Sequence, residues 1–305
     1  MIIRILGSAA GGGFPQWNCN CRNCSAVRAG QRGLQARTQT SIAVSADGNA
    51  WTLLDASPDL RAQILAAAAL QPSANDPPRS SPIKAVALTG CEIDQVGGLP
   101  NLREVVSLQF HASRFVLDSL LESTVFDALT PHAVTRHAIE SGKAFEPFEG
   151  AGIALTAVPV AGKIPLHLQP SQIYRHRRGD ETVGFVIEDH ATGRRAAYVP
   201  GCASVTDTLR SALAGVDLLL FDGTLYSENE MVLQKLSSKT GTSMGHICMS
   251  GDGGSIESLH DVAIARRVFI HLNNSNPVLN DNSRERDAVT SAGWEVAYDG
   301  MELRI

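Results

Sequence analysis

Short apolar runs rich in β-branched residues recur along the chain, and most of them end at a polar or glycine-rich turn. Two pairs of runs, 41–44 with 51–54 and 183–187 with 196–199, are each joined by a short turn and predict two β-hairpins. Further strands are expected at 2–6, 83–88, 153–158, 218–221, 268–270 and 294–297. A hairpin followed by helix and strand thus occurs twice, which predicts two packed sheets covered by helices and one domain spanning residues 1–305.

Capping residues mark the helices between these strands. The segment 57–69 begins with a cap residue, a proline for the first helical position and an early acid, and predicts a helix. A second helix is expected at 206–215, where a threonine begins it and a glycine ends it. A third is predicted at 282–293, because Asn282 and Glu285 resemble a capping box.

The composition limits the classes of partner. Of the 305 residues, 44% are apolar, and a net charge of −5 gives no basic field that would attract nucleic acid. The apolar runs are too short to cross a bilayer, and residues 1–15 lack the basic and long apolar regions of a signal peptide. We therefore expect a soluble cytoplasmic protein with no membrane partner and with reduced thiols. A basic run at 174–178, in a polar loop expected at 167–181, is typical of a solvated surface, with contact to an acidic substrate as the alternative.

Three of the six cysteines, Cys19, Cys21 and Cys24, lie close together in a polar loop. Thiolates bind zinc tetrahedrally at about 2.3 Å, and this spacing lets one loop supply three ligands. The alternative is three unrelated thiols, since cysteine is often buried as a small apolar residue. Burial alone would not gather three of them in a polar loop, so the triplet predicts a structural zinc site closed by a fourth ligand from elsewhere.

Polar residues follow several of the predicted strands. Asp222 and His271 each come directly after an apolar run, and Glu92 and Asp94 follow another one closely. His246 lies in a glycine-rich loop. Because sites assemble at the carboxyl ends of strands in α/β proteins, we expect these side chains to form one. The alternatives are an ordinary strand-to-helix turn for the two acids, a turn cap for Asp222, and a surface or buried structural position for each histidine.

Seven segments spread from end to end of the chain match a known family. They are residues 6–13 (Leu-Gly-Ser-Ala-Ala-Gly-Gly-Gly), 15–19, 37–39, 56–59, 245–246, 271–277 (His-Leu-Asn-Asn-Ser-Asn-Pro) and 299–301. Together they resemble the PqqB family of pyrroloquinoline quinone (PQQ) biosynthesis proteins, within the metallo-β-lactamase fold superfamily. The resemblance implies an α/β fold, the metallo-β-lactamase-like αββα four-layer sandwich.

The superfamily's metal motif His-x-His-x-Asp-His falls on residues 90–95, where only Asp94 matches. His271 takes the place of the last metal histidine, whereas the positions near Gly162 and Gly201 lack the remaining ligands. A dinuclear metal-dependent hydrolase therefore ranks low. In PqqB-like proteins the remaining site is mononuclear and resembles two histidines and one carboxylate. In non-haem Fe(II) enzymes such a ligand set leaves coordination positions open for substrate and dioxygen. The family implication is hydroxylation of tyrosine in a small Glu–Tyr peptide.

Gln95 stands where the family has its second histidine. The resemblance therefore leaves one of the three iron ligands without a matching residue. His246 or Gln95 itself is expected to complete it, with Glu92 near the metal. Asp222 is expected to orient a ligand by a hydrogen bond. An alternative function, favoured by the missing histidine, is a non-catalytic carrier that binds PQQ or its precursor for transport.

The resemblance also bears on the zinc and on partners. In related folds with this cysteine triplet the fourth ligand lies three residues past the last metal histidine, which is Asn274 here. Arg37 or Arg61 is expected to meet substrate carboxylates. The expected partners are a small peptide or quinone precursor, other PQQ biosynthesis proteins, and a second copy of the chain in a homodimer.

Overall fold

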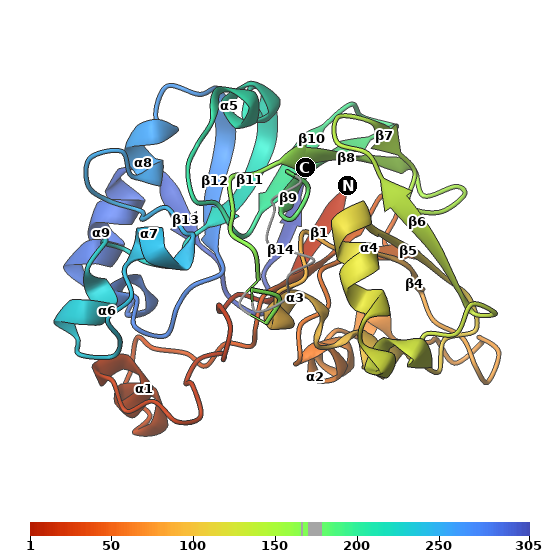
Figure 1. Ribbon diagram of the computed structural model, residues 1–305, viewed down its shortest axis with the longest axis horizontal. Coiled ribbons are helices and arrows are strands. Elements are labelled where there is room, and N and C mark those ends of the chain that lie inside the picture. The colour runs from red at the N-terminus through yellow and green to blue at the C-terminus, as the bar shows by residue number, and fades with distance from the viewer. Residues whose placement is uncertain (166, 170–178) are drawn as a thin grey trace.

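Two seven-stranded β-sheets pack face to face and carry helices on their outer sides (Figure 1). The computed structural model describes residues 1–165, 167–169 and 179–305. The basic run at 174–178 and much of the loop predicted at 167–181 therefore lie outside the described residues.

The first sheet contains strands from both ends of the chain, in the order β14-β1-β2-β3-β4-β5-β6. Strands β14 to β3 pair antiparallel, and β3 to β6 pair parallel. The bounds are β1 (Ile2–Gly7), β2 (Ser41–Ser45), β3 (Trp51–Leu54), β4 (Ile83–Ala87), β5 (Leu108–Ser113), β6 (Val134–Ile139) and β14 (Glu302–Arg304).

The second sheet repeats this scheme in the order β13-β12-β11-β10-β9-β8-β7. Strands β7 to β10 pair antiparallel, and β10 to β13 pair parallel. The bounds are β7 (Ala144–Phe145), β8 (Ile153–Pro159), β9 (Val183–Asp189), β10 (Arg195–Val199), β11 (Val216–Asp222), β12 (Ile264–Ile270) and β13 (Trp294–Val296).

Three apolar clusters hold the layers together. The central cluster joins the inner faces of the two sheets, as with Ile42 of the first and Phe185 of the second. Another joins the first sheet to α2 (Leu60–Ala66) and α4 (Arg114–Leu121), and the third joins the second sheet to α5 (Asp207–Leu213) and α9 (Arg284–Ser291). Burial of these faces supplies most of the favourable free energy of folding. The arrangement is the αββα sandwich that the sequence predicts.

Short helices fill the connections between strands and carry several side chains of interest. They are α1 (Arg22–Arg28), α3 (Ile93–Val96), α6 (Glu230–Leu233), α7 (Gly241–Met244), α8 (Ser255–Ser258) and the 3-10 helices η1 (Ala68–Leu70), η2 (Leu99–Leu102), η3 (Thr124–Ala128) and η4 (Pro277–Leu279). None of the helices in the described ranges combines the length and the apolar character needed to cross a membrane.

The structure confirms both hairpins and corrects two helix starts. The helix predicted to begin at Ser57 and Pro58 begins at Leu60, with Asp59 as its N-cap. Strands β2 and β3 pair antiparallel, as do β9 and β10. Thr206 caps α5 as predicted, because its side chain accepts a hydrogen bond from Leu209 N. The capping box predicted at Asn282 is wrong: Ser283 is the N-cap of α9 and accepts from Arg286 N.

Candidate functional site

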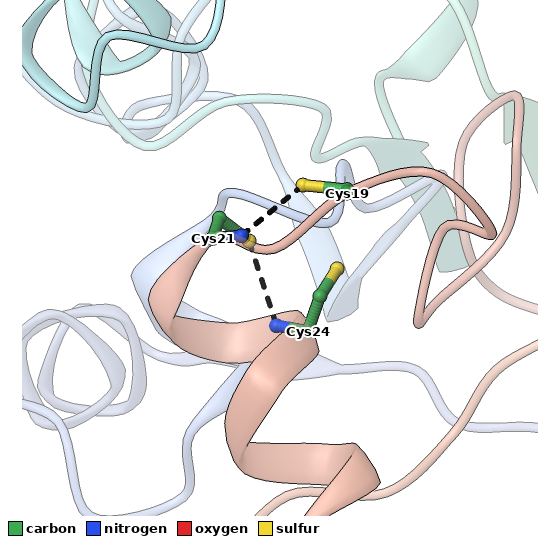
Figure 2. A group of neighbouring side chains, drawn as sticks. All are labelled: Cys19, Cys21 and Cys24. Carbon is green, nitrogen blue, oxygen red and sulfur yellow. Dashed lines mark hydrogen bonds between the residues drawn. The ribbon is translucent and has the colours of Figure 1, made fainter.

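The three cysteines of the N-terminal loop lie together at the start of α1 (Figure 2). Their sulfur atoms all lie within 4.8 Å of one another. Two of the sulfurs accept backbone hydrogen bonds: Cys21 N donates to Cys19 Sγ at 3.4 Å, and Cys24 N donates to Cys21 Sγ at 3.5 Å. The fold of the loop therefore arranges the thiols as a group.

Asn274 brings a fourth polar side chain to this group from a segment 250 residues beyond Cys24. Its amide nitrogen lies 3.1, 3.6 and 3.4 Å from the Sγ atoms of Cys19, Cys21 and Cys24. A half-turn of the amide exchanges this nitrogen for the oxygen, which has the lone pairs that a metal needs. Asn23 ties the same segments together by donating to the Asn274 carbonyl at 3.1 Å. The predicted set of zinc ligands thus comes together.

Burial opposes ionisation of two of the three thiols, Cys21 and Cys24. Burial raises the pKa of Cys24 to about 12. Burial also opposes ionisation of Cys21, but the hydrogen bond from Cys24 N and those from its neighbours hold its pKa below the usual value. Thiolates are the form that binds zinc, and the ion supplies the positive charge that offsets their burial. The chemistry of this donor set fits zinc.

A cavity of about 440 Å³ opens at the carboxyl ends of strands from both sheets. Asp94 reaches it from α3 and His271 directly from the end of β12, and His271 Nε2 lies 3.0 Å from Asp94 Oδ2. Burial opposes the charged form of both groups. Their mutual hydrogen bond nevertheless raises the pKa of His271 and lowers that of Asp94. The backbone of His271 has a φ of 61°, in a region that few histidines adopt, so the surrounding structure holds this residue in place.

Thr224 fixes the orientation of two imidazole rings. Its hydroxyl donates to Asp222 Oδ1 at 2.7 Å, and its oxygen lies 2.8 Å from Nδ1 of His271 and 3.0 Å from Nδ1 of His246. Because the single hydroxyl hydrogen goes to Asp222, the oxygen accepts from N–H groups of the rings. Both rings therefore turn Nδ1 toward Thr224 and Nε2 away from it, and Nε2 of His271 is hydrogen-bonded to Asp94 Oδ2 at 3.0 Å.

Asp222 contacts His246, and their ligand atoms and that of His271 lie within 4.8 Å of one another. The Asp222 carboxylate is fully buried and accepts from Cys202 N at 2.8 Å, from the amide and hydroxyl of Thr224, and from His246 Nδ1 at 2.7 Å. Burial opposes its charge, but His246 holds its pKa below the usual value. The hydrogen bond to His246 is the contact through which Asp222 would orient this ring.

Gln95 lines the cavity, but its amide is committed to the protein. The oxygen accepts from Glu92 N at 2.9 Å, and the nitrogen donates to the Thr89 hydroxyl at 2.9 Å. Gln95 therefore stabilises the turn that carries Asp94, and does not offer its oxygen to the cavity. Glu92 also lines the cavity, where burial raises its pKa.

A buried hydrogen-bond network lies behind this turn. Asp55, which follows β3, accepts from the amide and hydroxyl of Thr89 at 2.8 and 2.9 Å and from the Tyr198 hydroxyl at 3.1 Å. Burial raises the pKa of Asp55 to about 7. Through Thr89, this network connects both sheets to Gln95 and to the turn that positions Asp94.

Relatives identify the family of the chain. A β-lactamase superfamily domain model matches residues 50–272. The chain is 50% identical to coenzyme PQQ synthesis protein B of Methylobacterium nodulans over 301 residues, 99% of each chain. It is 45% identical to the protein of that name from Rhizobium meliloti, covering 99% of this chain and 97% of that one. The chain belongs to the coenzyme PQQ synthesis protein B (PqqB) family.

Solved structures agree with membership of the PqqB family. The Zn²⁺-bound PqqB of Methylobacterium extorquens is 45% identical and matches with a TM-score of 0.93, with 100% of both chains covered. A diphosphatase of the PhnP family matches with a TM-score of 0.68 at 20% identity, over 100% of this chain and 97% of that one, and so shares the fold. The predicted fold and family are confirmed, and the role of this chain lies in PQQ biosynthesis.

The arginines predicted to meet the substrate lie away from the cavity of this PqqB-family chain. Arg37 is buried, where its guanidinium donates to the Ser8 hydroxyl at 3.2 Å and to the Ala297 carbonyl, and it lines a separate hollow. Arg61 is exposed on α2. Neither arginine is among the described residues that line the cavity at Asp94.

Sequence reasoning missed three residues of this PqqB-family site. Thr224 contacts both histidines, and its one sequence signal is its position two residues after Asp222 at a strand end. Lys163 and Lys239 line the cavity from loops without a recognisable motif.

Proposed function

We propose that this chain hydroxylates the tyrosine of a small Glu–Tyr-type peptide in PQQ biosynthesis, with Fe(II) held by Asp94, His271 and His246. The observation that carries the proposal is the meeting of Asp94 and His271 at the cavity. His246, whose ring stacks on that of His271 at 5.3 Å between centroids, supplies the second imidazole in place of Gln95. Two histidines and one carboxylate suit non-haem iron.

When bound, iron supplies the activation of dioxygen that hydroxylation needs. One oxygen atom enters the tyrosine ring and the other leaves as water, which requires two electrons from an added reductant. The residues of the chain orient the ligands: Thr224 and Asp222 hold the imidazoles through Nδ1, and Gln95 holds the turn of Asp94. Metal binding by His271 and Asp94 would require loss of the hydrogen that Nε2 and Oδ2 share. A cavity of about 440 Å³ suits a small ligand such as a dipeptide.

We also propose a structural zinc ion bound by Cys19, Cys21, Cys24 and Asn274. Support comes from the convergence of these four side chains, and from the zinc in the solved PqqB of Methylobacterium extorquens. With four protein ligands such a site has no open position for a substrate, so its role is to stabilise the fold.

The test combines metal content with turnover. Protein purified under argon is analysed for metals, loaded with Fe(II), and supplied with Glu–Tyr, dioxygen and ascorbate. We expect one zinc and one iron per chain and a catechol product with one added oxygen atom. Asp94→Ala should keep the zinc but bind no iron and form no product. Asp127→Ala, at an exposed acid, is the control and should retain zinc, iron and product formation. Absence of both iron and catechol in the wild type would refute the proposal.

A non-catalytic carrier of PQQ or its precursor is the second candidate. The observation in its favour is that both polar ends of the Gln95 side chain are engaged, so the family's second histidine has no direct replacement. Tight quinone binding without turnover, unchanged in Asp94→Ala, would support it. A hydrolase would need two metals besides the cysteine zinc, which the same metal analysis detects.

A further inference from the structure

Two lysines line the cavity that holds Asp94 and His271. Lys163 belongs to the segment after β8, and Lys239 to the segment before α7. Among the described residues, they are the two lining side chains with a permanent positive charge. Their position makes them the candidates for the substrate contact that the sequence assigns to arginines.

Lys163 packs against the backbone of the neighbouring segment. Gly245 ends α7 with a φ of 79°, and a Cβ built there would come within 3.2 Å of Lys163 Cγ and Cδ. The aliphatic stem of Lys163 therefore lies directly on this glycine. A side chain that is already packed loses less conformational entropy when it binds a ligand.

The ammonium group of Lys163 has one nearby acid among the described residues, Glu92. Its Nζ lies 3.9 Å from Glu92 Oε1, which is too long for a hydrogen bond. Lys163 thus offsets the charge of Glu92 through space, and over the described part of the chain its three N–H donors remain for a ligand. The Lys163 side chain is 26% exposed, so a ligand in the cavity can reach it.

Lys239 adds a second cation, for which the described residues provide no ion-pair partner. The residue is exposed and forms no ion pair with any described residue. The acid closest to the proposed iron, Asp94, already has His271 as its counter-charge. A carboxylate of a bound ligand would therefore find cations at Lys163 and Lys239 that no hydrogen bond to a described acid engages.

We infer that Lys163 and Lys239 bind two carboxylates of the substrate and make the site selective for small acidic peptides. The inference rests on the proposed function, because it concerns the ligand of the same cavity. A peptide with an acidic side chain and a free C-terminal carboxylate presents two such groups. Each forms a charge-assisted hydrogen bond with a lysine, which is stronger than a bond between neutral groups.

Binding under argon, without turnover, tests this directly. Calorimetry compares Glu–Tyr with Gln–Tyr amide, in which both carboxylates are neutralised, on metal-loaded protein. Lys163→Gln and Lys239→Gln should each weaken Glu–Tyr binding by about tenfold and leave Gln–Tyr amide unchanged. Lys163→Arg should retain the preference for Glu–Tyr. Lys235→Gln, at an exposed lysine of the same segment as Lys239, is the matched control and should bind like wild type.

The outcomes separate this inference from the hydroxylase proposal. Equal losses for both ligands, or no loss in either lysine variant, would overturn the carboxylate contacts even if catechol forms. Charge-selective loss in both variants would support them even if no catechol forms, and in that case the hydroxylase proposal alone would fall.

Discussion

The hydroxyl oxygen of Thr224 lies 2.8 Å from Nδ1 of His271, although 47 residues separate the two in sequence. The same oxygen lies 3.0 Å from Nδ1 of His246. One threonine thus contacts Nδ1 of both imidazoles, and Asp222 shares the contact to His246. Two of the three proposed iron ligands therefore have a common hydrogen-bond partner.

Replacing Thr224 by valine should weaken Fe(II) binding by about 10- to 100-fold, because partners that orient metal ligands have effects of that size. Anaerobic titration with Fe(II) measures the change. Thr182→Val is the matched control, since Thr182 lines the same cavity without a described contact to either imidazole. Equal iron affinity in Thr224→Val and wild type would rule out the orienting role.

Replacing Cys21 by alanine should lower the melting temperature by about 5 °C or more and also weaken iron binding. The reason is that Asn274 lies three residues after His271, so the proposed zinc joins the N-terminal loop to the turn of the iron ligand. Calorimetry and Fe(II) titration provide the two readouts. Cys248→Ala, at an equally buried thiol outside the cluster, should keep its zinc. An unchanged melting temperature in Cys21→Ala would contradict the account.

Replacing Gln95 by histidine should raise Fe(II) affinity by about tenfold, because an imidazole is a better iron ligand than an amide. The variant should also melt at a lower temperature, since two hydrogen bonds worth about 1 kcal/mol each are lost. Gln95→Asn should lose the same hydrogen bonds without gaining iron affinity, and so separates the two effects. A histidine variant with no gain over Gln95→Asn would show that position 95 cannot reach the metal.

Asp55 should make stability depend on pH. Its pKa is 3.8 ordinarily and about 7 when folded, so between about pH 4 and 7 the folded state keeps a proton that the unfolded state has lost. The contribution of Asp55 to stability therefore falls as the pH rises through this range and is constant above it. Melting temperatures of wild type and Asp55→Asn measure this. From pH 4 to 7, the melting temperature of the wild type should fall relative to that of the variant. A constant difference would contradict the raised pKa.

The sequence predicts much of the fold because buried strands carry strong apolar patterns. Strands β3, β4 and β11 are apolar almost throughout and were predicted close to their bounds. Strand β6 was missed because it lies at a sheet edge, where polar and exposed residues interrupt the pattern. Strand β7 has only two residues and carries too little pattern to detect.

The candidate site was predictable only where chemistry is concentrated in a short segment or at a strand end. The cysteine triplet met the first condition and His271 met the second, whereas Asp94 lies on α3, after the turn that follows β4. Its fourth partner, Asn274, came from the resemblance. The commitment of Gln95 to Thr89 depends on side-chain orientation, which no motif specifies. Lys163 and Lys239 line the same cavity only because two loops pack around it, and sequence spacing gives no signal for that.

The most direct test of the central claim supplies the iron-loaded protein with Glu–Tyr, ascorbate as the reductant and dioxygen labelled with heavy oxygen, and weighs the product by mass spectrometry. The account predicts one heavy oxygen atom in the tyrosine ring of the product, and no labelled product from Asp94→Ala. A product with oxygen from water, or the same labelled product from the Asp94 variant, would contradict it.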